Sequence, residues 1–443
     1  MSHFKISVRA AANTKILFLS MIFHGLEIMY AIRLKKYQHH NQSFVAIVDE
    51  NDCPYDPFVS AYLSTLVNQS FNTQLRKAIE LMFVLQQFAS YGIDLPGRMA
   101  SGQLVNEKEY LLFYDASCVK KSAVENNVIS FRRIGDKSLR NIISANHRRK
   151  MTVSSETVQG RIRRFREYSR WLFDHYHDLF GLDEVILNKF LRFESRIKID
   201  EGSLGRNRSQ KISDPLESVI PDDVFARLME IILPSSSNNP FSSSKVRNYL
   251  IVSILCQTGI RRGALAKLKI SDCYFSGTYD RIAIYRSGRD RTDQRLDKPN
   301  QKTKSHLVTV SPVLMRQIKI YIEQIRSRVP MRQAHDFIFV SEKNSRGTIG
   351  CPISLKSINA IFQKLSDVLQ FSIHPHLLRH KWNEVFDKEG EAQGVDPKLL
   401  EDIRKYAMGW SELSIMNETY NDKRLALKAK EISLAHQKRM DGL

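Results

Sequence analysis

Residues 194–211 lose the helical spacing of apolar residues and divide the chain into two parts. They combine basic residues with glycine and serine, a composition typical of a linker. Each part of this 443-residue chain is long enough to bury a core of its own. We expect a mainly α-helical protein with a small β-sheet, organised as an N-terminal extension at 1–50, a helical domain at 51–198 with an insertion near 119–153, a basic linker at 199–216, and a second domain at 217–443.

The net charge points to the partner of the protein. The chain has 67 Lys and Arg against 47 Asp and Glu, which gives a formal charge of +20, and 42% hydrophobic content excludes wholesale disorder. Such an excess favours nucleic acid first and an anionic membrane surface second. The five cysteines are far apart and form no C-x-x-C pair, which excludes a disulfide scaffold and fits a reducing compartment.

The membrane alternative depends on one apolar stretch, Ile16–Tyr30. It contains His24 and Glu27 and is shorter than the ~20 residues that span a bilayer. Basic residues precede it as in a secretory signal, but no small-residue cleavage site follows. We therefore expect no membrane association and interpret the stretch as an N-terminal helix or as residues upstream of a start at Met21 or Met29.

The first part reads as two short strands followed by helices. The strands are expected at Met29–Leu34 and Ser43–Val48, and Asn72 is expected to cap a helix that ends at Gly92. A further helix is expected at Asn106–Cys118, and a strong one from Ser154 or Ser155 to Tyr176.

The helix that ends at Tyr176 carries a stripe of arginines beside its apolar face. The apolar face is Ile162, Phe165, Tyr168, Trp171 and Leu172, and the stripe is Arg161, Arg163, Arg164, Arg166 and Arg170. A solvated helix face and a phosphate-binding surface are both open interpretations, and the scarcity of acidic residues in the same turns favours DNA. Arg206 and Arg208 in the basic linker are candidates for the same role.

The second part contains four short motifs. The first is Thr258-Gly259-Ile260-Arg261, with Leu268 and Ser271-Asp272 after it, and the second is the lysine-rich turn Lys302-Thr303-Lys304-Ser305 before a strand at His306–Ser311. The third is His376-Leu377-Leu378-Arg379-His380 at a helix start, where positions i and i+3 share a face. The fourth is Met408-Gly409-Trp410, ten residues before Tyr420.

In this order the four motifs resemble the tyrosine recombinases of the phage-integrase type. The resemblance covers residues 217–425 and extends more loosely to the helices at 70–180. It implies a helical core-binding domain and a catalytic domain that form a C-shaped clamp on double-stranded DNA. It also implies a site-specific recombinase or integrase of a mobile element, which cuts and rejoins strands through a 3′-phosphotyrosine without metal, ATP or another cofactor.

The resemblance also implies a role for each motif residue. Tyr420 is the expected nucleophile, and Arg261 and Arg379 are expected to bind non-bridging phosphate oxygens. His376 would contact the same phosphate or accept the tyrosine proton, and Trp410 would donate an indole N–H. Lys302 is the expected general acid, with Lys304 and Lys298 as alternatives because the hairpin is long.

Ala264 stands where relatives often carry an acidic residue, which predicts altered packing around the site, and Glu391–Lys405 is longer than in compact relatives. A metal site made of His374, His376, His380 and Glu384 is disfavoured because Arg379 would repel a cation.

Two other classes of function remain open. A type IB topoisomerase uses a similar set of residues but needs no separate helical clamp, and a non-cutting DNA-binding relative would retain the fold without the reaction. As a recombinase, the chain would be a monomer or dimer off DNA and a homotetramer at synapsis. Its tail from Lys423 would dock on a neighbouring protomer, accessory directionality proteins are possible partners, and the expected location is the bacterial cytoplasm at the nucleoid.

Overall fold

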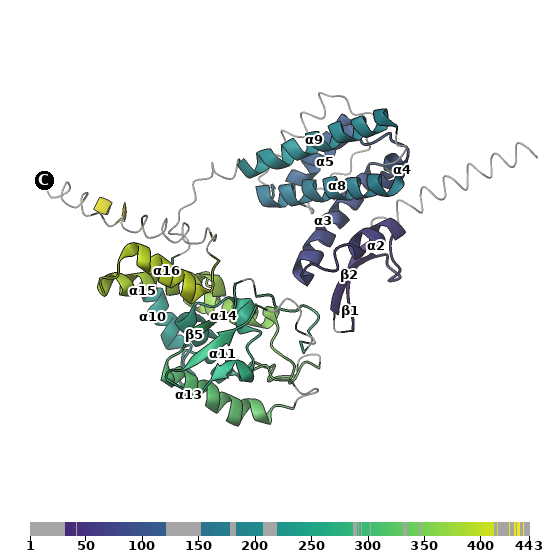
Figure 1. The fold of residues 1–443 in the computed structure, drawn as a ribbon. Helices are drawn as coiled ribbons and strands as arrows, with labels where there is room; N and C mark the ends of the chain where they lie inside the picture. The colour runs from purple at the N-terminus through teal and green to yellow at the C-terminus, as the bar shows by residue number, and fades with distance from the viewer. Residues whose placement is uncertain are drawn as a thin grey trace, which may run out of the picture. The chain divides into compact units, whose positions relative to one another are not determined.

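The fold is mainly helical and divides into two compact units, Met1–Ile212 and Ser213–Leu443 (Figure 1). The computed structural model describes residues 32–40, 42–120, 152–177, 183–206, 219–286, 290, 292–293, 295–301, 303–330, 335–344, 347–411 and 414, together with a few residues between 425 and 437. The expected insertion lies outside this set except at its ends, where Val119 and Thr152 form an isolated bridge. None of the helices in the described ranges is long and apolar enough to cross a bilayer.

The first unit is a helical bundle with one β-hairpin. Its elements are β1 (Arg33–His39), β2 (Gln42–Val48), α2 (Pro57–Ser64), α3 (Phe71–Ser90), α4 (Leu95–Ala100), α5 (Glu107–Cys118), α8 (Ser155–Tyr176) and α9 (Glu184–Arg206). The Ser70 hydroxyl caps α3 by accepting from the amide of Thr73, so the expected cap at Asn72 is wrong by two residues. The helices expected at Asn106–Cys118 and from Ser154 or Ser155 to Tyr176 are confirmed, and the side chains of Asn106 and Ser154 cap them.

The core of the first unit forms around α8. The ring of Phe165 on α8 stacks on Phe88 of α3 with centroids 4.8 Å apart, and it lies 4.9 Å from the Phe113 ring of α5. Ile162 and Tyr168 on the same face are fully buried. The predicted apolar face of this helix is therefore confirmed.

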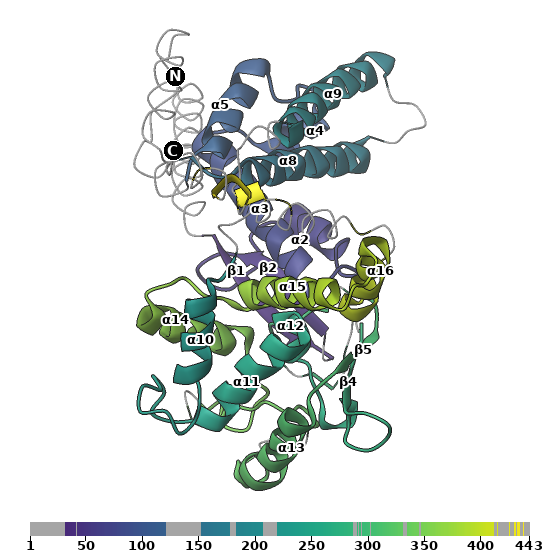
Figure 2. The same cartoon turned by 90° about the vertical axis from the view of Figure 1, so that its left-hand side faces the viewer.

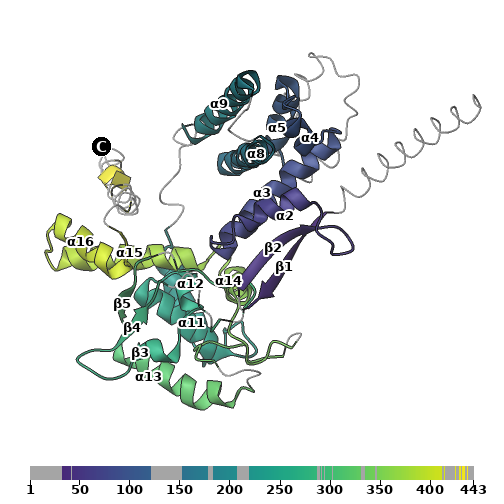
Figure 3. The ribbon, with the colours of Figure 1, turned by 45° about the vertical axis from the view of Figure 1, so that its right-hand side comes forward.

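The β-hairpin belongs to this core, although the sequence suggested an extension at 1–50. Val45 and Ile47 of β2 are 6% and 1% exposed and pack in the same cluster as the helices, and β2 lies along α3 (Figure 3). Residues 29–31 of the expected strand Met29–Leu34 lie outside the described residues, and β1 runs from Arg33 in a register that pairs Arg33 with Val48. The alternation of buried residues on β2 fixes that register, since a shift by one residue would turn its apolar side chains outward.

α9 continues through the first half of the predicted linker. Phe190 and Ile197 are fully buried against the rest of the unit, and Glu201, 8% exposed, pairs with arginines of α8. These contacts hold residues 199–206 in a helix despite Gly202 and Gly205, because tertiary packing outweighs the low helix propensity of glycine. The remainder of the predicted linker lies outside the described residues.

The second unit contains the four motifs. Its elements are α10 (Asp222–Ile231), α11 (Lys245–Thr258), α12 (Arg262–Leu265), η4 (Ile270–Asp272), β3 (Cys273–Tyr274), β4 (Arg281–Ile284), β5 (His306–Thr309), α13 (Pro312–Ile320), η5 (Tyr321–Ile325), η6 (Arg326–Arg328), α14 (Leu355–Leu369), α15 (Pro375–Ala392) and α16 (Pro397–Met408).

α11 is the central helix of the second unit. Five successive or near-successive residues are fully buried on it: Leu250, Ile251, Val252, Ile254 and Leu255. A helix that is apolar all round must be covered on every side, and α12, α13 and α15 contact α11 (Figure 2). The strands form an antiparallel sheet in the order β3-β4-β5, and β5 lies beside α16. This arrangement brings the second and fourth motifs to one place.

Candidate catalytic site

The first motif forms a turn at Gly259, which ends α11 with a φ of +60°. A Cβ at this position would lie 2.7 Å from Cε of Met408 and 2.9 Å from Cδ2 of Trp382, closer than non-bonded atoms approach. Glycine is therefore required both by the left-handed backbone and by the packing. The turn of the first motif is in contact with α15 and with the fourth motif.

Two side chains of α15 fasten this turn by hydrogen bonds to backbone carbonyls. Nη1 of Arg379 donates to the oxygen of Gly259 at 2.6 Å, and Nε1 of Trp382 donates to the oxygen of Gln257 at 2.8 Å. Pro375 begins α15, and the His374 side chain caps it by accepting from the amide of Leu377 at 3.3 Å. Arg379 is thus held in place by the turn that leads to Arg261.

Arg261, Arg379 and Trp410 surround one region of the unit. Arg261 is the N-cap residue of α12 and is half-buried, whereas Arg379 is only 2% exposed. The guanidinium carbon of Arg379 lies 5.6 Å from the centre of the Trp410 ring, within the range of a cation–π interaction. Trp410 is 6% exposed and packs with Met408 and Trp382. The two arginines concentrate positive charge beside the end of α16.

The lysine-rich turn lies against the first and fourth motifs. The amide of Lys304 donates to the oxygen of Gly409 at 2.8 Å, and Gly263 is so close to the carbonyl oxygen of Asn300 that a Cβ would overlap it. Gln301 and Thr303 are 3% and 5% exposed, and the Gln301 amide donates to the Thr303 hydroxyl. The residues on both sides of Lys302 are therefore held within the site.

The three lysine candidates differ in what the structure says of them. Lys302 lies outside the described residues, so its role stays a prediction. The side chain of Lys304 is exposed. Nζ of Lys298 donates to the oxygen of Asp290 at 3.2 Å, and burial lowers the pKa of this lysine. Lys298 thus stabilises its own loop.

The structure places His376 on the exposed side of α15, with its ring 4.3 Å from that of His380. Two members of the alternative metal set are engaged elsewhere. His374 caps the helix, and both carboxylate oxygens of Glu384 accept from Lys381 at 3.1 Å, while Lys388 also pairs with Glu384 at 2.8 Å. The described residues contain no group of three or more candidate metal ligands. Tyr420 lies outside the described residues.

The arginine stripe of α8 lies in the first unit and is paired by carboxylates from neighbouring helices. Glu201 of α9 accepts from Nε of Arg163 at 2.6 Å and from Nε of Arg166 at 3.0 Å, and Glu194 pairs with Arg170. Arg161 donates to backbone oxygens of Ser117 and Val119 at 2.8 and 2.9 Å, and its guanidinium lies over the ring of Phe83. Acidic residues are few in the same turns of α8, but Glu194 and Glu201 of α9 supply carboxylates to the stripe, so their scarcity on α8 does not favour DNA.

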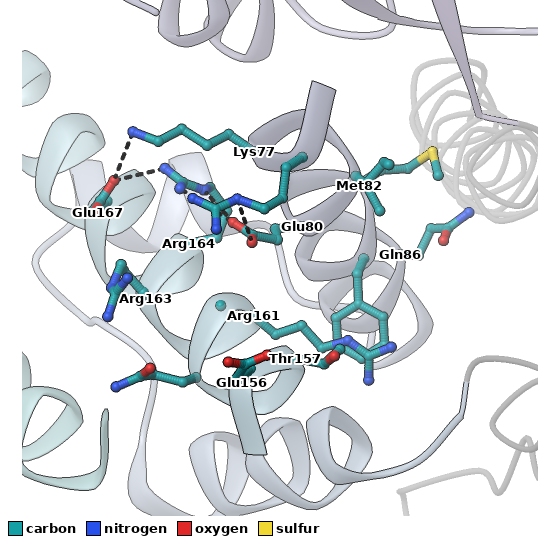
Figure 4. Close-up of a pocket in the computed structure, with 15 residues that line it drawn as sticks. Lys77, Glu80, Met82, Gln86, Glu156, Thr157, Arg161, Arg163, Arg164 and Glu167 are labelled. Carbon is teal, nitrogen blue, oxygen red and sulfur yellow. Dashed lines mark hydrogen bonds and ion pairs between the residues drawn. The ribbon is translucent and has the colours of Figure 1, made fainter. Parts of the chain in front are cut away.

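Arg164 is a core residue of the first unit. It is 1% exposed, and Nη1 donates to the Tyr62 hydroxyl at 2.6 Å. Nη1 also donates to Glu167 at 2.7 Å, and Nη2 lies 3.3 Å from Glu80 (Figure 4). Burial raises the pKa of Glu80, against the opposing effect of the arginine. Arg164 contributes to a cleft of about 700 Å³ between α3 and α8. Its side chain is covered by protein and is not available for a phosphate, which corrects its assignment to DNA binding.

Of the other DNA-binding candidates, Arg163 and Arg170 keep side-chain exposures of 40% and 35%. The side chain of Arg206 and the whole of Arg208 lie outside the described residues.

Sequence reasoning missed His306, the first residue of β5. Its ring packs on Gly409, and Nδ1 lies 2.9 Å from the oxygen of Lys304. Burial, together with the nearby Arg379 and Arg261, lowers the pKa of His306. Nothing in the chain's local pattern singles this histidine out, because its neighbours come from the fourth motif. By contrast, the spacing of Glu194 and Glu201, two helical turns apart, could have revealed the acidic face of α9.

Comparisons with known proteins agree with the motifs. The phage integrase family matches residues 219–426. A tyrosine recombinase of Pseudothermotoga lettingae is 21% identical over 281 residues, which cover 59% of this chain and 86% of that protein. The tyrosine recombinase XerA of Pyrococcus furiosus is 23% identical over 202 residues, 46% of this chain and 58% of that protein.

Among solved structures, a XerH site-specific recombinase bound to palindromic difH substrate in a post-cleavage complex is 15% identical, with a TM-score of 0.43, covering 84% of this chain and 93% of the other. The XerA recombinase crystal structure is 17% identical with a TM-score of 0.33, covering 76% and 98%. The family match spans all four motifs in their expected order. Residues 219–426 thus match the phage integrase family, and the named proteins that the chain resembles are tyrosine recombinases.

Proposed function

We propose that this protein is a site-specific DNA recombinase that cleaves and rejoins DNA through a 3′-phosphotyrosine intermediate. The observation that carries the proposal is the convergence on Gly259 and Gly409. Arg379 of the third motif binds the first motif at Gly259, and Lys304 of the second motif binds the fourth at Gly409. Four motifs that are distant in sequence thus form one electropositive site.

The reaction follows from the chemistry of these side chains. The Tyr420 hydroxyl attacks the scissile phosphorus, a bond forms between its oxygen and phosphorus, and the bond to the 5′-oxygen breaks. Arg261 and Arg379 stabilise the charge that develops on the non-bridging oxygens. Lys302 donates a proton to the leaving 5′-oxygen, and His376 accepts the tyrosine proton or hydrogen-bonds the phosphate. Trp410 supports Arg379 through the face of its ring. These roles use side chains alone and require no metal or ATP.

The partner in this proposal is double-stranded DNA, held by both units. The formal charge of +20 supports this partner, and Arg163 and Arg170 are its candidate contacts in the first unit. Recombination joins two sites, so we propose a homotetramer at synapsis in which the tail from Lys423 docks on a neighbouring protomer. Leu425, Ile432 and Leu434 of the tail are 62%, 62% and 47% exposed, which leaves apolar side chains for such a contact. The proposed place of action is the nucleoid in the cytoplasm.

A nicked duplex tests the proposal, because cleavage next to the nick releases a short fragment and traps the covalent complex. We expect the full chain to become attached to the DNA in the presence of a chelator, with the adduct mapped to Tyr420 by peptide mass spectrometry. Failure to form any adduct on a library of duplexes, with intact DNA binding, would favour the non-cutting alternative. Relaxation of any supercoiled plasmid, without exchange between two sites, would favour the type IB topoisomerase alternative.

A further inference from the structure

The ring of His306 occupies the space above Gly409, at the junction of the second and fourth motifs. A Cβ at position 409 would lie 2.7 Å from Cε1 and 2.8 Å from Cγ of the imidazole, and closer still to Nδ1. Gly409 also has a φ of +60° at the end of α16. The ring therefore packs face to backbone on the residue before Trp410, a contact that no other residue at 409 permits.

Hydrogen bonds close this contact into a small network. Nδ1 of His306 lies 2.9 Å from the oxygen of Lys304, and the amide of Lys304 donates to the oxygen of Gly409 at 2.8 Å. A carbonyl oxygen can only accept, so Nδ1 must carry the hydrogen. Lys304 is thus bound to Gly409 twice, once directly and once through the imidazole.

The charges around His306 favour its neutral form. Among the described residues, Arg261 at the start of α12 and Arg379 of α15 are the charged groups that act on it, and Gly409 at the end of α16 contributes none. Lys304 of the turn presents its carbonyl to the ring while its side chain is exposed. Burial and then the two arginines lower the pKa of His306, against the opposing effect of the hydrogen bond to Lys304. A second proton on the ring would add a positive charge beside two others.

We propose that His306 is a positioning residue that holds the turn at Thr303 and Lys304 on Gly409, so that the neighbouring Lys302 reaches the leaving 5′-oxygen. This inference rests on the proposed function and adds a residue to it. His306 exchanges no proton with the substrate: the proton passes from the Lys302 ammonium to the 5′-oxygen as the phosphorus–oxygen bond breaks. The imidazole keeps the donor and the phosphate-binding residues in a fixed relation.

The test is single-turnover cleavage of a nicked duplex by the full chain. We expect His306→Ala to slow cleavage by about 10²-fold without a change in DNA affinity, since a displacement of about 1 Å of a reacting group has that effect. His306→Asn should cleave at close to the parent rate at pH 7.5, because its amide nitrogen can take the place of Nδ1. His335→Ala is the matched control, since His335 also contacts a carbonyl, that of Gly350 at 2.8 Å, and has no assigned role.

Two further readouts separate positioning from a general effect on folding. A substrate with sulfur in place of the bridging 5′-oxygen needs no proton donor, so His306→Ala should cleave it nearly as fast as the parent. The pH profile is the second readout. The pKa of His306 in the folded protein lies below its ordinary value, which means that the neutral imidazole makes the favourable contacts. The stabilisation by neutral His306 is therefore complete above pH about 6.5, the ordinary pKa, and is lost as the pH falls through the lower pKa of the folded protein. The parent should lose more rate on that acid side than His306→Asn does, because His376 is present in both proteins and its contribution is common to them.

Each outcome decides the inference. Parent-like cleavage by His306→Ala overturns it, and so does a defect that persists on the sulfur substrate. If His306→Ala does not fold, the pH profile of His306→Asn is the test. A smaller loss of cleavage rate at acid pH than in the parent supports the proposal, and a loss equal to that of the parent overturns it. Absence of a covalent adduct with the parent protein would instead contradict the proposed function itself.

Discussion

Nη1 of Arg379 donates a hydrogen bond to the carbonyl oxygen of Gly259 at 2.6 Å, which couples the two arginine motifs through the backbone of one residue. Position 259 has no space for a methyl group and has a left-handed backbone. The geometry of this turn therefore sets where Arg379 lies and how the chain reaches Arg261.

Gly259→Ala should destabilise the second unit by about 2–4 kcal/mol, the sum of the strain of a left-handed alanine and of overpacking. Thermal or urea unfolding measures this change. Gly394→Ala is the matched control, because Gly394 also has a positive φ, +70°, but no atom lies within 4 Å of its Cβ position. Its cost should be about 1 kcal/mol, from the backbone alone. Equal losses for the two variants would show that packing against Met408 and Trp382 contributes nothing.

Tyr420→Phe should abolish covalent attachment to a nicked duplex and leave DNA affinity nearly unchanged, because only one hydroxyl is removed. Gel electrophoresis under denaturing conditions detects the adduct, and a mobility-shift titration measures binding. An adduct yield from Tyr420→Phe equal to that of the parent would contradict the assignment of Tyr420 as the nucleophile.

Lys302→Ala should slow cleavage by about 10²–10⁴-fold, the usual contribution of a general acid, while DNA binding stays intact. The sulfur-bridged substrate should restore its rate, whereas Arg261→Ala should remain slow because the phosphate charge is still uncompensated. Rescue of Lys304→Ala or Lys298→Ala instead would move the role to that lysine. If the sulfur-bridged substrate restores the rate of none of the three lysine variants, no lysine among them acts as the general acid.

Arg164→Ala should destabilise the first unit by about 3–5 kcal/mol, because it leaves the carboxylates of Glu80 and Glu167 without their buried cation. Arg163→Ala should cost less than about 1 kcal/mol, since its pair with Glu201 is partly solvated. If Arg163 contacts a phosphate, its removal should also lower the log–log salt slope of DNA binding by about 0.9. Similar unfolding free energies for the two variants would contradict this division.

Deletion of residues 428–443 should weaken recombination between two sites far more than binding to one site, because the tail is proposed to join protomers. Recombination assays and single-site titrations give the two quantities. Unimpaired recombination by the shortened protein would show that the tail has no part in assembly.

The sequence predicted the helices well wherever a cap and an apolar face occur together, as at Ser154 with Ile162 and Phe165. It also placed the first motif at a helix end and the third at a helix start, because Gly259 ends α11 and Pro375 begins α15. The sequence-based prediction failed where the role of a residue depends on partners that are distant in the sequence. Glu194 and Glu201 neutralise the arginine stripe from another helix, and His306 gains its role from Gly409, about a hundred residues away. Local periodicity contains neither relationship.

The burial of the β1–β2 hairpin has a practical consequence for preparing pieces of this protein. A fragment that starts after residue 50 would lack Val45 and Ile47, and it would leave the side of α3 that they cover open to water. Each of these side chains contributes about 1.5–3 kcal/mol by its burial. Such a fragment would be prone to aggregate. A soluble piece of the first unit should therefore begin before Ile32, whose own side chain is 6% exposed in the same core.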